Sequence, residues 1–173
     1  MNEYTIINNM YYQGTVNKSD MAHIQLRDFY VEIIREDVEK TFFNIQYYYI
    51  CRIVFKDLLG RIVREIVLNE NQARILLDNM STFIYDNYTE LVCLSDITST
   101  NIAETYGFKL SATEENGDFC VLFQVICYNS VLGTSFPVIS TVMSLDELDK
   151  LTDIMYFIFL IDLVSERKGI YKV

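Results

Sequence analysis

Residues 67–86, VLNENQARILLDNMSTFIYD, align without a gap onto residues 142–161, VMSLDELDKLTDIMYFIFLI, at an offset of 75 positions. Both segments begin with the same helix-start pattern, a capping residue followed three positions later by Glu or Gln. The two pairs are Asn69 with Gln72 and Ser144 with Glu147. In this pattern each side chain accepts a hydrogen bond from the other residue's backbone N–H. The duplication indicates that the chain contains two copies of one folding unit.

Apolar residues at helical spacing follow both caps, so each copy is expected to end in an amphipathic helix. The first set is Ala73, Leu76, Met80 and Phe83, and the second set is Leu148, Leu151, Met155 and Ile158. We predict helices over residues 70–87 and 145–166. The cationic turn Arg167-Lys168, followed by Gly169, is typical of a helix end and predicts that the second helix stops there.

Strand-like sequence, rich in β-branched and aromatic residues between turn signals, precedes each predicted helix. The predicted strands are residues 29–34, 42–55 and 61–68 in the first copy and 106–113, 119–128 and 136–143 in the second. Asn116-Gly117 is the strongest short hairpin signal in the chain. Each copy therefore has the predicted order β-β-β-α.

The two copies predict one pseudo-symmetric α+β domain. A three-stranded meander with one helix cannot bury both of its faces alone, so the copies should pair into a two-layer body. We expect an antiparallel sheet from two tandem β-β-β-α repeats, with two amphipathic helices packed on one face. The predicted divisions are an N-terminal arm or extra strand at 1–24, the first repeat at 25–88, a linker at 89–104 and the second repeat at 105–173.

The composition is that of a globular, acidic protein. Of 173 residues, 51% are hydrophobic and 22% are charged, which favours a packed core over disorder. The net charge of −10 argues against binding to a phosphate backbone, which requires a cationic surface. Residues 87–166 hold 12 acidic side chains against only Lys109 and Lys150. The electrostatic field of so many acidic side chains in one part of the chain steers the protein toward a basic surface on a partner protein.

Few residues suit catalysis or a cofactor. His23 is the only histidine, and the chain has no phosphate-binding glycine motif and no nucleophile motif. The four cysteines contain no C-x-x-C pair, so they predict buried free thiols of a reduced protein rather than a zinc site. They are Cys51, Cys93, Cys120 and Cys127. We therefore expect no catalytic residues, no bound metal and no cofactor.

The same sequence shows no secretory signal, and its longest apolar run, residues 154–161, is too short to cross a bilayer. These observations predict a cytoplasmic protein without direct contacts to a membrane.

Acidic side chains and two tyrosines are the candidates for contact with a protein partner. The acidic candidates occupy the predicted hairpin and the start of the second predicted helix; they are Glu114, Glu115, Asp118, Asp146, Glu147 and Asp149. Tyr47 and Tyr49 alternate along a predicted strand and so share one face. Tyrosine supplies contact area at low entropic cost, which suits both residues to anchoring a partner.

The second half of the second predicted helix is apolar on nearly every side. Such a helix must be enclosed, either by the other repeat or by a second copy of the chain. The candidates for self-association in a homodimer are Tyr156, Phe157, Phe159 and Leu160.

The first hypothesis for function is a non-enzymatic inhibitor that occupies a basic, nucleic-acid-binding groove on a target such as a nuclease. In size, charge and lack of catalytic motifs, the chain resembles anti-defence proteins such as anti-CRISPRs, which phages and mobile elements use. Its many Asn, Ile and Tyr residues, single Pro and absent Trp indicate an AT-rich genome.

Three alternatives remain open. In the first, the chain is an immunity or accessory protein that neutralises a toxin or joins an assembly. In the second, it is a carboxylate-dependent enzyme with two acids in a pocket. In the third, it is a homodimer with no other partner.

Overall fold

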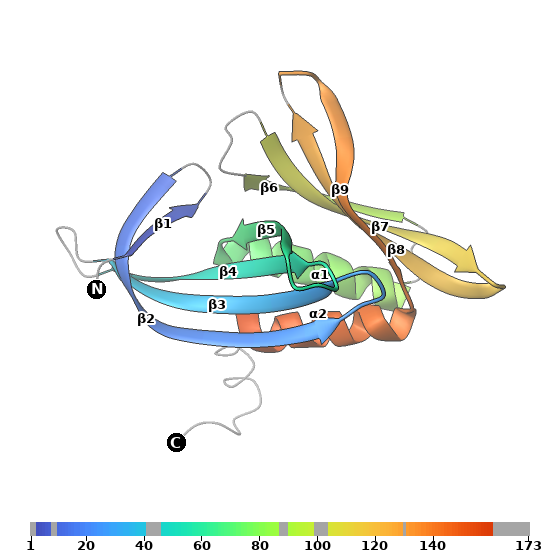
Figure 1. Ribbon diagram of the computed structural model, residues 1–173, viewed down its shortest axis with the longest axis horizontal. Helices are drawn as coiled ribbons and strands as arrows, with labels where there is room; N and C mark the ends of the chain where they lie inside the picture. Colours follow the sequence, from blue (N-terminus) through green and yellow to red (C-terminus); the bar gives the residue numbers. More distant parts are fainter. Residues whose placement is uncertain are drawn as a thin grey trace.

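The computed structural model describes residues 3–7, 10–40, 46–86, 90–98, 104–129 and 131–160. Within these ranges, nine strands form two antiparallel sheets with the orders β1-β2-β3-β4-β5 and β6-β7-β8-β9 (Figure 1). The strands of the first sheet are β1 (Glu3–Ile7), β2 (Met10–Gln25), β3 (Tyr30–Lys40), β4 (Gln46–Lys56) and β5 (Ile62–Leu68). Those of the second sheet are β6 (Glu90–Thr98), β7 (Glu104–Glu115), β8 (Asp118–Asn129) and β9 (Thr134–Met143).

One helix follows each sheet along the chain, α1 (Glu70–Asp86) after β5 and α2 (Leu145–Phe159) after β9. The α+β class and the tandem arrangement of antiparallel strands followed by a helix are therefore confirmed. The two helices contact each other and lie along the first sheet, with α2 against β2 and β3 and α1 against β4 and β5 (Figure 1). The second sheet also contacts the helices, since α1 touches β6 and α2 touches β8.

The strands differ from the expected set in two respects. Within the described residues the first repeat has five strands and the second has four, rather than three in each, and the repeats form two sheets rather than one continuous sheet. Residues 89–104, predicted as a linker, contain β6, which pairs with β7 and has a register shift between Cys93 and Ile97. Residues 1–24, predicted as an N-terminal arm or an extra strand, contain β1 and most of β2, and β2 pairs along β3. These polar segments form strands because they pair with a neighbouring strand, and the local sequence does not show which strand will lie beside them.

A single hydrophobic core joins the two repeats. The Phe55 ring of β4 packs on the Phe123 ring of β8 with centroids 6.3 Å apart, and Phe123 packs on Phe108 of β7 at 5.8 Å. The buried helix residues of the same core are Leu76, Leu77, Met80, Phe83, Leu148, Leu151, Met155 and Ile158. Each repeat buries apolar surface of the other, so we expect the two to unfold as one cooperative unit.

Both predicted helix caps are present with reciprocal hydrogen bonds. The Gln72 backbone N–H donates to Asn69 Oδ1, and the Asn69 N–H donates to Gln72 Oε1, both at 2.9 Å. Ser144 and Glu147 form the same pair of bonds at 3.1 Å. The described part of α2 ends at Phe159, and the predicted extension to residue 166 with its cationic turn at 167–169 lies outside the described residues.

The predicted Asn116-Gly117 hairpin connects β7 to β8. Both residues have positive φ angles, 54° and 84°, as the two-residue turn of a tight hairpin requires. Glu115 pairs with Asp118 across this turn. The tip therefore holds acidic side chains on a short, well-defined turn.

Removing either cap should destabilise the protein to a similar extent. We expect Asn69→Ala and Ser144→Ala each to lower the free energy of unfolding by about 1 kcal/mol, because one backbone N–H loses its partner. Urea unfolding followed by circular dichroism measures this loss. Ser135→Ala, an exposed strand position, is the control. Equal stability of the cap variants and the control would show that the caps contribute nothing.

Candidate protein-binding surface

The two acidic clusters that the sequence singled out lie at the same end of the second repeat. Val121 of β8 pairs with Met143, the last residue of β9, so the β7–β8 tip lies next to the start of α2 (Figure 1). Glu114 and Asp118 are exposed at this tip. Asp118 and Asp146, which are 28 residues apart in the chain, thus contribute to one acidic region.

The exposed face of α2 extends this acidic region along the helix. Asp146, Asp149 and Asp153 are spaced by three and four residues, which places them on one face. Asp146 and Asp153 are exposed and Asp149 is half-buried. We call Glu114, Asp118, Asp146, Asp149 and Asp153 the acidic surface. Helical periodicity could have added Asp153 to the candidates from sequence.

The acidic face of α2 has no counterpart on the helix of the other repeat. At the offset of 75 residues, Asp146, Asp149 and Asp153 correspond to positions of α1 that hold Asn71, Arg74 and Asp78. The three positions therefore sum to a charge of −3 on α2 and to zero on α1. Because the core positions of both helices are apolar, this charge difference is not required by the fold.

Two of the predicted contact residues are satisfied within the chain instead. Glu115 accepts a hydrogen bond from Arg27 in the β2–β3 turn at 2.6 Å, and this bond lowers the pKa of its carboxyl group. Glu147 is half-buried and caps α2 through Ser144. The Arg27 contact ties the first repeat to the second, and so does a 3.2 Å hydrogen bond from Thr141 Oγ1 to Asp28. Glu115 and Glu147 thus have structural contacts and are not part of the acidic surface.

The basic side chains of the first repeat mostly pair with carboxylates. Those with a carboxylate partner are Arg27, Arg35, Arg52, Lys56, Arg61 and Arg74. By contrast, in the described part of the chain no basic side chain pairs with any carboxylate of the acidic surface. Among the side chains that the structure describes, the acidic surface therefore holds five carboxylates without a basic partner.

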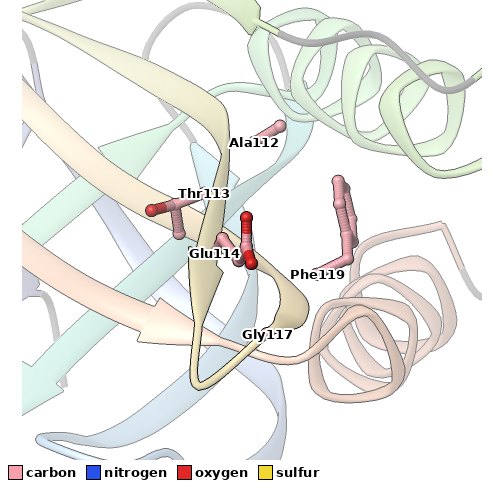
Figure 2. A pocket seen from close by; sticks show the side chains of 5 residues that line it. All are labelled: Ala112, Thr113, Glu114, Gly117 and Phe119. Carbon is pink, nitrogen blue, oxygen red and sulfur yellow. The ribbon is translucent and has the colours of Figure 1, made fainter.

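A shallow, open pocket of about 510 Å³ adjoins the hairpin tip. It is lined by Ala112, Thr113, Glu114, Gly117 and Phe119, and Figure 2 shows the Glu114 carboxylate and the Phe119 ring bordering the same hollow. Glu114 and Phe119 are direct cross-strand partners. A single carboxylate beside an exposed aromatic ring suits a guanidinium group, which can pair with the charge and stack on the ring.

The tyrosines lie away from the acidic surface. Tyr49 packs against the core, and the Arg35 guanidinium lies 3.9 Å from its ring centroid. Burial, together with nearby Glu70, raises the pKa of Tyr49. Arg35 also donates to the Phe159 carbonyl at the far end of α2, about 20 Å from Asp146 by the rise of the helix. Tyr47 lies two residues along β4, and its side chain is outside the described residues.

The predicted self-association residues divide between the core and the surface. Phe159 and Leu160 are 0% and 3% exposed and belong to the shared core, so the prediction that they contact a second copy was wrong. Tyr156 is half-buried, while Phe157 is 49% exposed. The apolar end of α2 is enclosed by the other repeat, through β2 and β3, which removes the need for a partner chain there.

The cysteines and the single histidine are the remaining reactive side chains among the described residues. Cys51, Cys120 and Cys127 are buried, and burial raises the pKa of the Cys51 thiol to about 12. His23 stacks on Tyr30 with ring centroids 5.1 Å apart. No cluster of potential metal ligands occurs among the described residues. Neither of the described helices has the length and apolar character needed to span a bilayer.

Comparison with known proteins finds similarity only at the level of structure. No protein-family model matches the chain, and no curated protein matches it in sequence. WHY1 from Arabidopsis thaliana is 9% identical with a TM-score of 0.44, covering 84% of this chain and 91% of that one.

Two further solved structures are similar to the same extent. WHY3 from Arabidopsis thaliana is 10% identical, with a TM-score of 0.47 and coverage of 81% and 86%. The plant transcriptional regulator PBF-2 is 9% identical, with a TM-score of 0.45 and coverage of 92% of each chain. At these values the likeness carries no argument about what this chain binds.

Proposed function

We propose that this chain is a non-enzymatic binding module whose acidic surface occupies a basic surface of a partner protein. More specifically, the proposed partner surface is the groove in which a nuclease or other nucleic-acid enzyme holds its substrate. By occupying this groove, the chain acts as an inhibitor of the enzyme. The supporting observation is the contrast in ion pairing. Six basic side chains of the first repeat have carboxylate partners, while the acidic surface of the second repeat has none in the described residues.

The arrangement of this surface suits contacts with several cations at once. Asp146, Asp149 and Asp153 follow one another at about 5 Å along the helix axis, because each residue rises about 1.5 Å. The pocket between Glu114 and Phe119 adds a site for one arginine side chain. Charges arranged in this way raise the association rate and make binding sensitive to salt.

Neutralising the three aspartates that α2 contributes to the acidic surface should weaken partner binding. The triple variant Asp146→Asn, Asp149→Asn, Asp153→Asn is expected to bind about tenfold to a hundredfold more weakly at low salt, since buried or steering charge pairs are lost. Partners are first captured from host lysate at about 0.05 M salt and released at about 0.5 M, where charges are screened beyond a few ångströms. Affinity of the purified partner for each variant is then measured by calorimetry.

The duplication supplies a matched control for this experiment. Asp78→Asn on α1 occupies the position equivalent to Asp153 and removes the same charge from an exposed helix face. We expect Asp78→Asn to bind like the unmodified chain and Asp153→Asn to bind more weakly. Equal effects of the two substitutions would show that net charge, and not the acidic surface, determines binding.

Competition for a labelled oligonucleotide tests the inhibitor form of the proposal. Addition of the chain should release the oligonucleotide from the captured enzyme, and the triple variant should not. Direct binding of the oligonucleotide to the chain itself would contradict the proposal. A captured toxin in place of a nucleic-acid enzyme would instead assign the chain as an immunity protein.

A further inference from the structure

The turn between β2 and β3, residues 26–29, is anchored to the shared hydrophobic core. Leu26 is 3% exposed, and its backbone N–H donates to the Phe29 carbonyl at 2.8 Å, which closes the turn. The Phe29 ring packs on the buried Phe55 ring in a T-shaped arrangement, with centroids 6.2 Å apart. Both ends of the turn are therefore held in place, and the two residues between them have a fixed base from which to reach the second repeat.

These two residues, Arg27 and Asp28, contact the two parts of the second repeat that carry the acidic surface. Arg27 Nη1 donates to Glu115 Oε2 at 2.6 Å, and Glu115 is the last residue of β7, next to Glu114 at the hairpin tip. Asp28 Oδ2 accepts from Thr141 Oγ1 at 3.2 Å, and Thr141 lies in β9, four residues before the start of α2. One turn of the first repeat thus touches both the β7–β8 tip and the strand that leads into α2.

The ion pair at this turn is not a general feature of the duplicated fold. At the offset of 75 residues, Glu115 corresponds to Lys40, which is likewise the last residue of its strand, β3. Arg27 corresponds to Ile102. A lysine and an isoleucine cannot form an ion pair, so the equivalent positions cannot make this contact. The contact is found at the end of the molecule that carries the acidic surface.

The second contact of the turn satisfies a buried polar group. Thr141 corresponds at the same offset to Ile66, and both residues are 2% exposed. A buried hydroxyl group lowers stability unless it has a hydrogen-bond partner, and Asp28 supplies that partner from the other repeat. The second repeat therefore carries a polar side chain where the first carries an apolar one, and this side chain is used to hold the β2–β3 turn.

We propose that Arg27 and Asp28 are positioning residues, which hold the β7–β8 tip and the start of α2 in the arrangement that a basic partner recognises. This role rests on the proposed function, since it concerns the same surface. Glu114 and Asp118 lie on a hairpin tip, and a tip that is already held in place loses less conformational entropy on binding. The two contacts should therefore slow dissociation of the partner, whereas exposed charges mainly set the association rate and its salt dependence.

The dissociation rate of the captured and purified partner tests this role in the full chain. Arg27→Met and Glu115→Gln should each speed dissociation about twofold to fivefold, the range for an exposed ion pair. The double variant should be no faster than either single one, because residues that act through their mutual contact have non-additive effects. Charge alone would act in opposite directions, since one substitution removes a positive charge and the other a negative one.

Each other pattern of rates would overturn the proposal. Opposite changes, additive changes or an effect of only one substitution would show that the two residues act separately. Unchanged rates would show that their contact has no part in binding. The charge-swapped variant Arg27→Glu, Glu115→Arg can form the ion pair again at the same net charge, so its dissociation rate should return toward that of the unmodified chain. Arg61→Met removes an exposed ion pair with Asp57 elsewhere in the first repeat and should leave dissociation unchanged.

A conservative substitution tests the second contact. Thr141→Val removes the hydroxyl group and leaves an apolar side chain at the buried position, as Ile66 does in the first repeat, so the chain should stay folded. Asp28 is exposed, and water can replace its lost partner. We expect Thr141→Val to speed dissociation by a factor similar to that of Arg27→Met, with circular dichroism confirming the fold. A folded Thr141→Val variant with an unchanged dissociation rate would remove Asp28 from the positioning role.

Amide hydrogen exchange of the free chain separates this role from the proposed function. Arg27→Met and Glu115→Gln should speed exchange in the β7–β8 tip and leave the β4–β5 hairpin unchanged, because only the tip loses a contact. This measurement needs no partner. Faster exchange at the tip without capture of any basic partner would mean that the proposed function is wrong. A captured basic partner with unchanged exchange at the tip would mean that the positioning role is wrong.

Discussion

Replacing Phe159 with alanine should lower the free energy of unfolding by about 4 kcal/mol, the range found when a buried aromatic side chain leaves a cavity. Phe159 is the last residue of α2 and has no exposed surface. It belongs to the core that both repeats share, and the close packing of that core limits how far the cavity can collapse.

The neighbouring aromatic residue on α2 provides the control for this substitution. Phe157 is 49% exposed, and Phe157→Ala should cost less than about 1 kcal/mol, because little apolar area leaves the core. Urea unfolding of the two variants gives the comparison. A similar loss for both would mean that Phe159 is not enclosed by the other repeat. It would also restore the prediction that this end of α2 packs against a second copy.

Replacing Arg35 with alanine should cost about 3 kcal/mol, the lower end of the range for breaking a buried charged network. Arg35 is 4% exposed, and its contacts include two hydrogen bonds and an aromatic ring. Its Nε donates to Asp37 at 3.0 Å, its Nη1 donates to the Phe159 carbonyl at 3.1 Å, and its guanidinium lies over the Tyr49 ring. The arginine thus connects β3 and β4 of the first repeat to the end of the second repeat's helix.

Burial, rather than ion-pair distance, determines this effect. Arg61 pairs with Asp57 at 2.7 Å, a shorter distance than that of Arg35 with Asp37, but the Arg61 side chain is mostly exposed. Arg61→Ala should therefore cost less than about 0.5 kcal/mol, as exposed pairs usually do. Arg35→Met keeps much of the packing of the stem and separates lost contacts from lost polar bonds. If Arg35→Ala and Arg61→Ala are equally mild, Arg35 does not hold the repeats together.

Local features of the sequence were predicted well because they depend on near neighbours. Ser144 and Glu147 are three residues apart and form their cap whatever lies around the helix. Asn116 and Gly117 adopt positive φ angles that few other residues tolerate. The missed strand β6 shows the limit of such inference, since its pairing partner and register shift lie outside the segment itself.

The candidate binding surface was only partly predictable. The charge imbalance identified the second repeat, and helical spacing would have placed Asp146, Asp149 and Asp153 on one face. Nothing local distinguished Glu115 from Glu114, because the partner of Glu115, Arg27, is 88 residues away in the chain. The apolar run at the end of α2 could be enclosed either by the other repeat or by a second copy of the chain. The position of the first sheet, which the sequence does not show, determines which of the two holds.

Local patterns and composition were enough to predict the duplicated unit, both helix starts, the tight hairpin and the acidic character of the second half. Each of these follows from backbone chemistry over a few residues or from composition. Packing between distant segments, by contrast, arranges the repeats as two sheets around one core and buries Phe159 and Arg35. It also brings the acids of the β7–β8 tip close to those of α2. Burial and pairing between distant segments depend on which surfaces pack together, and that choice is made by the whole chain at once.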